Sequence, residues 1–509
     1  MNSYLTRVAK HGHVMIIESD FLNLDTTYQG VDIDALRDFA DKRLPENFDK
    51  LRTQLMRGEF YNATEDRHVS HCLNRSIHNV VTAGNGKNRF CTIVRELRAG
   101  KWLGATGKPI TDVVNIGVGG SDLGPMMGSF ALKEFADDNS LHNLSVHFVS
   151  SMDGGQLYAV LPITDPETTL FVIASKSFGT IDTLANVDTV RRWVEPTLTQ
   201  EQWLSRHVIG VSANNQAMTD FGIPPAQQLS FAESVGGRFS LWSAIGLPIA
   251  LTIGSNQFGR MLEGAKAMDD HFAKAPLEKN IPLQMALLGV YNREVREINN
   301  LTVLPYDGRL RYLPNYLQQL DMESNGKQCD FEGNAIDYPT GPIIWGGFGP
   351  NGQHAFFQHL HQGYDKFCAD FIAVLKRAAP DFEPPVQEGL AEQQRLAVAN
   401  CLAHRRLMWF GAENGEARNH YIGNHPSNLL FVDELTPQSF GALIAAYEHK
   451  VFTQGVIWNL NSFDQPGVEK GKKLSIEILD VLDAKAATEF DASTDAVVSR
   501  LKISPESKT

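Results

Sequence analysis

The chain has 509 residues, with 46 Lys and Arg against 59 Asp and Glu and a formal net charge of −13. Its length exceeds that of one typical hydrophobic core, so we expect two packed units. The acidic balance argues against broad contact with nucleic acid or an anionic membrane, although a local cluster of donors can still bind an anion.

The cysteines and the N-terminus indicate a cytoplasmic protein. The cysteines are odd in number, scattered and without a CxxC pair, as expected of free thiols in a reducing compartment: Cys72, Cys91, Cys329, Cys368 and Cys401. Residues 1–16 contain no apolar run long enough for a signal peptide. No stretch approaches the roughly 20 apolar residues that a transmembrane helix needs.

Residues 31–110 are predicted to be helical, with Leu36, Phe39 and Ala40 at helical spacing. From Asp112 the pattern changes to short apolar runs that end in Gly or Ser and open into helical patterns. These runs are Val113–Gly117, Val146–Ser150, Leu170–Ser175 and His207–Ser212. Strands that are apolar throughout and alternate with helices indicate a parallel sheet covered on both faces.

A second alternating series follows a predicted helix at 283–298. Its strands are Leu301–Pro305, Pro342–Gly346, Asp370–Leu375 and Leu429–Leu435, with helices expected at 378–400, Ser439–Trp458 and Val468–Leu482. We therefore predict an α/β fold of two doubly wound domains with parallel-rich sheets and helical terminal segments. The expected boundaries are a helical N-terminal segment packing on the second domain (1–110), a first domain (111–250), a second domain (280–482) and a C-terminal tail (483–509).

Ligands of open α/β sheets bind beyond the carboxyl ends of the strands, and the first such junction is GVGGSDLGP, Gly117 to Pro125. Its glycines allow close approach to a ligand, and Ser121 offers a hydroxyl. Asp122 replaces the last glycine of a dinucleotide fingerprint and would oppose a pyrophosphate. Taken alone, the segment fits a binding loop and a tight turn before a capped helix equally well.

The second junction is SKSFGT, Ser175 to Thr180, at the expected start of a helix over Thr183–Trp193. It combines three hydroxyls, one ammonium and a glycine, the donors that a phosphate group prefers at a helix N-terminus. A hydroxyl-rich helix cap is the alternative. We favour a monophosphate site.

Four other residues could take part in chemistry, although each is unremarkable alone. Glu323, near a predicted helix end, could act as a base, and Arg238 follows two glycines that allow close approach to a ligand. His354 is expected at the start of a helix, and Lys472 lies on a predicted helix face. His68, His71 and Cys72 lack a second set of ligands, so we expect no metal.

Together these segments closely resemble the phosphoglucose isomerase family over most of the chain, from Asn62 to the Lys472 segment. The most specific motifs are IGVGGSDLGP, VGGRFSLWSAIGL, QQLDMESNGK, NGQHAFFQ and LIAAYEHKVFTQGVIWNLNSFDQ. The resemblance implies two sugar-isomerase (SIS) domains and a homodimer with its active site near the subunit interface. It also implies interconversion of D-glucose 6-phosphate and D-fructose 6-phosphate through a cis-enediolate, in glycolysis and gluconeogenesis. No cofactor is expected.

The resemblance also implies a role for individual residues. Glu323 would transfer the proton and Arg238 would stabilise the enediolate. His354, contributed by the partner subunit, and Lys472 would assist ring opening. The substrate-binding residues would be Gly120, Ser121, Ser175, Lys176, Ser177, Thr180, Gln319 and Gln465.

The chain departs from the family pattern at several positions, where SKSFGTIDT stands for SKTFTTQET and GGFGPNGQH for GEPGTNGQH. Gly179 stands where the family has Thr, so the loop loses a possible hydrogen-bond donor. Asp182 stands where the family has Glu, so the carboxylate is on a shorter side chain. Ile181 and Gly347 are further departures, and Pro466 suits the first turn of the helix that carries Lys472. We expect these changes to tune the rate or loop motion.

Three alternative functions are compatible with parts of this pattern. A sugar-phosphate-binding regulator would need SKSFGT but not Glu323, Arg238, His354 and Lys472 together. A nucleotide-dependent kinase or dehydrogenase is disfavoured by Asp122 and by the missing P-loop lysine. Isomerisation of a related hexose phosphate, such as mannose 6-phosphate, depends on the shape of the pocket.

Overall fold

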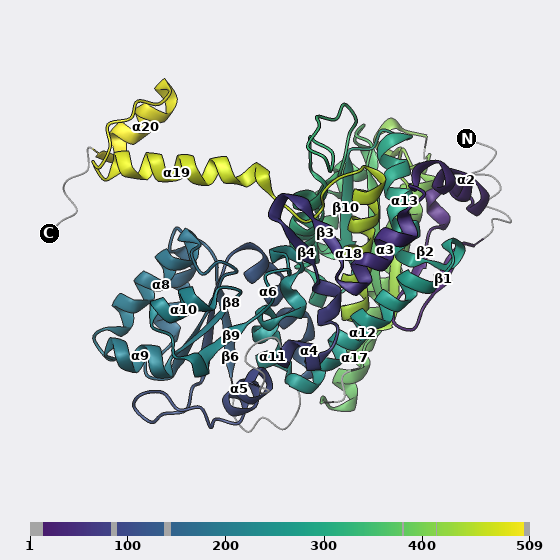
Figure 1. Cartoon of the computed structure of the whole chain (residues 1–509). Helices are drawn as coiled ribbons and strands as arrows, with labels where there is room; N and C mark the ends of the chain where they lie inside the picture. The colour runs from purple at the N-terminus through teal and green to yellow at the C-terminus, as the bar shows by residue number, and fades with distance from the viewer. Residues whose placement is uncertain (1–13, 83–88, 137–143, 379–380, 414, 503–509) are drawn as a thin grey trace. The chain divides into compact units, whose positions relative to one another are not determined.

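The structure, a computed structural model, describes residues 14–82, 89–136, 144–378, 381–413 and 415–502. The chain forms two compact units, Met1–Ser462 and Phe463–Thr509. The first unit contains two large β-sheets flanked by helices and a small antiparallel pair, β3 (Phe60–Asn62) with β4 (Arg67–Val69) (Figure 1). Within the described ranges, no helix is long and apolar enough to cross a membrane.

The first sheet is parallel throughout, with strand order β6-β5-β7-β8-β9. Its strands are β5 (Asp112–Ile116), β6 (Ser145–Val149), β7 (Thr169–Ala174), β8 (Val208–Ser212) and β9 (Gln228–Ser230). Every residue of β7 and β8 is buried, as expected for strands covered on both faces. The four strands predicted for this region are confirmed, and β9 extends the sheet at one edge.

Helices and a shared apolar core surround this sheet. They are α6 (Leu123–Leu132), α7 (Gly155–Val160), α8 (Ile181–Val194), α9 (Gln200–Arg206) and α10 (Asn215–Phe221). Phe171, Val190 and Trp203 belong to one buried cluster of this region. The helix predicted from Thr183 is α8, which begins two residues earlier, directly after the SKSFGT segment.

The second sheet has the order β1-β2-β13-β12-β10-β11. Its strands are β1 (Ile16–Glu18), β2 (Asn23–Asp25), β10 (Asn300–Pro305), β11 (Ile343–Gly346), β12 (Cys368–Lys376) and β13 (Ser427–Glu434). Strands β10 to β13 are parallel and match the four predicted runs, whereas β2 pairs antiparallel with β13. The N-terminal region was predicted as helical, but it contributes β1 and β2 to this sheet and also contains the β3–β4 pair. Each of these strands has three residues, too few to display an alternating pattern.

Helix α18 (Pro437–Ile457) is almost wholly buried and lies along α12 (Ser255–Lys274) and α13 (Ile281–Glu294) (Figure 1). The remaining helices of this unit are α2 (Ile33–Arg43), α3 (Phe48–Arg57), α4 (Ile77–Thr82), α5 (Arg89–Arg98), α11 (Leu247–Ile253), α14 (Leu313–Leu317), α15 (Gly349–Gln353), α16 (Phe357–Gln362) and α17 (Pro384–Phe410). The helix expected at 378–400 is thus longer than predicted.

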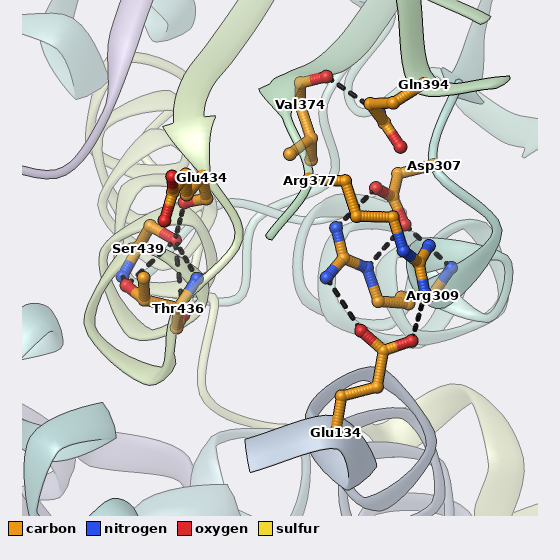
Figure 2. A network of polar contacts seen from close by, with 9 residues as sticks. All are labelled: Glu134, Asp307, Arg309, Val374, Arg377, Gln394, Glu434, Thr436 and Ser439. Atoms are coloured by element: carbon orange, nitrogen blue, oxygen red, sulfur yellow. Dashed lines mark hydrogen bonds and ion pairs between the residues drawn. The ribbon is translucent and has the colours of Figure 1, made fainter. Parts of the chain in front are cut away.

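A cluster of ion pairs fills the carboxyl edge of the second sheet, beyond β10 and β12 (Figure 2). Glu134, just after α6, lies between Arg309 and Arg377 and pairs with both; its Oε2 is 3.1 Å from Arg309 Nη1. Arg309 also contacts Asp307, with Nη2 2.7 Å from Oδ2. Because Glu134 follows a helix of the first sheet, the cluster joins the two sheet regions.

The second unit, taken by itself, is helical. A short 3-10 turn at Pro466–Val468 precedes α19 (Glu469–Leu482), and α20 (Ala492–Lys502) follows. The predicted helix Val468–Leu482 is confirmed to within one residue. Pro466 opens the turn before α19 and not the first turn of the helix itself.

Candidate active site

Glu323 and Arg238, two of the four residues singled out for chemistry, contact one another. Arg238 Nη1 lies 3.3 Å from Glu323 Oε2. The arginine side chain is 2 % exposed, while the glutamate side chain is 25 % exposed and so open to a ligand. The pair combines a carboxylate that can accept a proton with a fixed positive charge.

The remaining nitrogens of Arg238 are held by hydrogen bonds. Its Nε donates to Ser324 Oγ at 2.6 Å, and its Nη2 donates to the Ser462 carbonyl at 2.7 Å. Tyr316 Oη donates to the Arg238 carbonyl at 3.3 Å. Because the guanidinium is planar and its donors point in fixed directions, these contacts set the direction in which its charge faces.

The loop after β5 packs backbone to backbone against the turn that carries Arg238. A Cβ atom at Gly120 would collide with the Gly237 carbonyl, so only glycine permits this approach. Gly119 has a φ of +60°, and a Cβ there would lie 2.9 Å from Gln319 Nε2. The structure therefore brings Gly120 and Gln319 to the Glu323–Arg238 region, with buried Ser121 next along the chain.

The SKSFGT loop connects β7 to α8, as predicted. Ser175 Oγ and Thr180 Oγ1 are 2.9 Å apart, and Ser177 Oγ accepts the Gly179 amide at 3.3 Å. Phe178 adopts a φ of +55° with its ring buried, which is a strained conformation for a non-glycine residue. The strained residue turns the loop and leaves hydroxyls and amides at the N-terminus of α8.

Lys176 lies in this loop among charges of both signs. Burial is the main cause that lowers the pKa of its ammonium to about 8; Arg67 and, more weakly, Arg238 also lower it, while Glu65 and Glu233 raise it. The interaction with Arg238 connects the loop electrostatically to the Glu323–Arg238 pair. A bound phosphate would offset the cost of gathering these cations.

The sequence predicted His354 at the start of a helix, and this is wrong: it lies at the C-terminal end of α15. There its amide donates to the Asn351 carbonyl at 3.0 Å. Its side chain is exposed. Within the described residues the His354 imidazole forms no hydrogen bond or ion pair, so the structure does not join this side chain to Glu323 in one subunit. The short α15 ends here because His354 leaves the helical conformation, with φ −94° and ψ 4°.

Lys472 and Gln465 belong to the second unit. Lys472 lies on α19, with Nζ 2.8 Å from Glu469 Oε1 one helical turn earlier, and its side chain is 62 % exposed. Gln465 directly precedes the 3-10 turn. Their contact with substrate stays a prediction.

The departures from the family pattern lie in uncrowded or exposed surroundings. Around Gly179, a Cβ would meet only Ser177 Oγ at 3.8 Å, and around Gly347 it would meet nothing within 4 Å. Ile181 is exposed at the start of α8, and the Asp182 carbonyl accepts from Asn186 Nδ2 at 3.0 Å. The structure therefore has room for larger side chains at both glycines.

Sequence reasoning missed two features of the site. Glu323 ends a π-helix, η12 (Gln318–Glu323), which the pattern of Tyr312–Leu320 did not distinguish from an α-helix; such turns are frequent at functional sites. Asp122, beside Ser121, is buried, and burial raises its pKa to about 6. A run of charged residues inside the predicted apolar helix Ser439–Trp458 was a further sign that ionic side chains are buried in the interior.

Among the residues that the structure describes, no group of three or more His, Cys, Asp or Glu side chains is placed to hold a metal ion. The residues that gather here are instead a carboxylate, a guanidinium and a loop of hydroxyls with one ammonium.

Comparison with known proteins agrees with these observations. The model of the family described as phosphoglucose isomerase matches residues 25–498. The glucose-6-phosphate isomerase of Idiomarina loihiensis is 71 % identical over 489 residues, covering 96 % of this chain and 100 % of that protein. That of Acinetobacter venetianus is 46 % identical over 503 residues, covering 95 % and 90 %.

A solved structure supports the same assignment. The crystal structure of a glucose-6-phosphate isomerase from Chlamydia trachomatis matches with a TM-score of 0.82 at 28 % identity, covering 99 % of this chain and 98 % of that one. The two parallel-rich sheets are thus those of the sugar-isomerase (SIS) fold that the sequence predicted. With 71 % identity over nearly its whole length to one member, the chain belongs to the phosphoglucose isomerase family.

Proposed function

We propose that the chain interconverts glucose 6-phosphate and fructose 6-phosphate at the Glu323–Arg238 pair. Membership of the family makes it an aldose–ketose isomerase with a role in glycolysis and gluconeogenesis. The observation that carries the assignment of residues is the 3.3 Å contact between Arg238 Nη1 and Glu323 Oε2, next to the glycine loop and within the field of Lys176.

The reaction moves one proton between neighbouring carbons of the open-chain sugar. The Glu323 carboxylate removes the proton from carbon 2 of the aldose. The C–H electron pair forms the carbon 1–carbon 2 double bond of a cis-enediolate, while the carbonyl pair of carbon 1 moves to its oxygen. A hydroxyl proton then passes from the oxygen on carbon 2 to the oxygen on carbon 1, the carbonyl re-forms at carbon 2, and Glu323 returns its proton to carbon 1 to give the ketose. Arg238 stabilises the negative oxygen of the enediolate, and because its donors are already fixed, little reorganisation is needed at that moment.

The phosphate of the substrate is bound by the SKSFGT loop. Ser175, Lys176, Ser177 and Thr180 supply hydroxyls and one positive charge, and α8 adds its dipole. Gly120 and Ser121 contribute from the loop after β5, and Gln319 contacts the sugar from the π-helix that carries Glu323.

Ring opening is assigned to His354 and Lys472. The chain acts as a homodimer, and His354 serves the active site of the partner subunit; its exposed side chain, free of hydrogen bonds to described residues, supports this. Lys472 assists ring opening and Gln465 contacts the substrate.

The enzyme works in the cytoplasm, which its five free cysteines support. Its domains run over 111–250 and 280–482, with an N-terminal segment at 1–110 and a tail at 483–509. Neither a metal nor another cofactor takes part.

The substitution Glu323→Gln tests the proposal, because glutamine keeps the size of the side chain but cannot accept the proton. We expect kcat to fall about 10²–10⁴-fold while KM stays near normal. NMR in D₂O with EDTA present measures the exchange of the substrate hydrogen for deuterium. The rate of this exchange should fall as much as kcat.

Glu392→Gln, on the exposed surface of α17, is the matched control and should behave as wild type. Full exchange in Glu323→Gln would remove Glu323 from the role of base, and dependence of the wild-type rate on added metal would contradict the expected chemistry.

A further inference from the structure

Asp321 stands two residues before Glu323 in the π-helix η12 and forms a buried ion pair with α18. Its Oδ2 accepts a hydrogen bond from Lys450 Nζ at 2.7 Å, and the two side chains are 2 % and 3 % exposed. Neither residue reaches the solvent-open side of the site, and neither has a task in the proton transfer described above. The pair does, however, connect the segment that carries the base to the central helix of the fold.

A π turn needs such a connection, because it is rarely favoured by the backbone alone and occurs mostly as single turns within helices. Here it follows directly on α14, so the alternative is continuation of the α-helix. Relaxation of the turn by one residue would rotate the following side chains by roughly 100° about the helix axis. Glu323, the last residue of the turn, would then face away from Arg238.

The segment is also fixed on the other side of Glu323. Asn325 Nδ2 donates to the Val451 carbonyl at 2.9 Å, and Asn325 Oδ1 accepts from Ser462 Oγ at 2.6 Å. Lys450 and Val451 are consecutive residues of α18, so the same helical turn holds the chain before and after the base. Two anchors that flank a residue determine its position more closely than either would alone.

The ammonium of Lys450 faces a second carboxylate as well, that of Asp370 on β12. Burial lowers the pKa of Lys450, but Asp321 and Asp370 outweigh it and leave the pKa raised, so the Lys450 ammonium stays charged. Asp370 has its own partners: Tyr447 Oη at 2.9 Å and Asn428 Nδ2 at 2.8 Å. Asp321 is therefore the carboxylate through which Lys450 acts on the π-helix.

We propose that the Asp321–Lys450 pair is a positioning device for the catalytic base, which holds η12 in its π-helical form and so keeps Glu323 beside Arg238. This inference rests on the proposed role of Glu323. Asp321 and Lys450 are positioning residues, since neither touches the substrate.

The test compares Asp321→Asn with Asp370→Asn. Both variants remove a buried carboxylate that faces Lys450, but only the first alters the π-helix. In Asp321→Asn we expect kcat to fall about 100-fold, the loss that a displacement of about 1 Å can cause. KM and the affinity for sorbitol 6-phosphate, a probe without a carbonyl that cannot isomerise, should not change because the phosphate loop is untouched. In Asp370→Asn we expect kcat within about twofold of wild type.

Equal losses of kcat in the two variants, or no loss in Asp321→Asn, would overturn the positioning role while Glu323→Gln stays inactive. Activity in Glu323→Gln would instead remove the proposed base and this inference with it, so the two failures are distinguishable. Should Asp321→Asn not fold, the double variant Asp321→Leu with Lys450→Met removes both charges and keeps the volume apolar. Lowered kcat in that folded double variant supports the proposal, and normal kcat overturns it.

Discussion

The parallel strands of both sheets lead into loops at the carboxyl edge, but the side chains that lie at the two edges differ. Beyond β5 and β7 of the first sheet, the chain leaves glycines, hydroxyls and Lys176 facing an open site. Beyond β10 and β12 of the second sheet, Glu134 and Asp307 neutralise Arg309 and Arg377 (Figure 2). At that second edge the protein's own carboxylates occupy the places where a ligand anion would bind two arginines.

The two sheets therefore share an architecture, but only one of the two carboxyl edges is left open to a ligand. Parallel sheets direct helix N-termini and loops to their carboxyl edge wherever they occur, so the fold offers two positions for an anion. One position retains hydroxyls and an ammonium, and we propose that it binds the phosphate of the substrate. The other is closed by an ion cluster that joins the two sheet regions, and it serves stability.

Among the changes that test this comparison of the two edges, removing the cation of the open edge should have the largest effect. In Lys176→Ala, KM should rise about 10–100-fold with a smaller change in kcat, because the charge-assisted contact to phosphate is lost. Lys101→Ala, at an exposed position outside the site, is the control. Steady-state kinetics with fructose 6-phosphate measures both, and an unchanged KM would place the phosphate elsewhere.

A smaller effect is expected from titrating the same group. Since the pKa of Lys176 is lowered to about 8, its positive charge is present at pH 7 and is lost as pH rises through 8. KM should therefore rise between pH 7 and pH 9, by up to about tenfold, while the phosphate of the substrate, with a second pKa near 6, stays doubly charged. In Lys176→Ala, KM should be flat over this range. A wild-type KM that is equally flat would contradict the assignment.

The smallest effect is expected at the closed edge. Glu134→Gln leaves the two arginines without their shared carboxylate, but the side chain is 43 % exposed and solvent screens the interaction. The free energy of unfolding should fall by about 1 kcal/mol in urea titrations, with kcat and KM unchanged. A raised KM would mean that the two edges are not independent, and the comparison above would fail.

Much of the fold could be predicted from the sequence, because its strands are continuous apolar runs that end in Gly or Ser. β7 and β8 are buried along their whole length and are unambiguous for that reason. β1 and β2 were not predicted, because strands of three residues carry no pattern. The SKSFGT loop between β7 and α8 could be located from its donors, and its binding of phosphate stays a prediction, whereas Glu323 and Arg238 meet only through tertiary folding and were singled out together by resemblance.

The interior charges were the main omission. Glu448, His449 and Lys450 interrupt an otherwise apolar helix, which is costly unless each finds a buried partner. The sequence displays that anomaly, but it does not name the partners. His354 illustrates the converse: its motif was correctly noted, yet its place at the end of α15 depends on a local conformation that residue types do not specify.

The contact of Gly120 with Gly237 fixes the spacing between the loop after β5 and the turn that carries Arg238. Two peptide backbones in direct contact have no rotamers to adjust, so side-chain motion cannot change this spacing. Even one methyl group at position 120 would force the two segments apart.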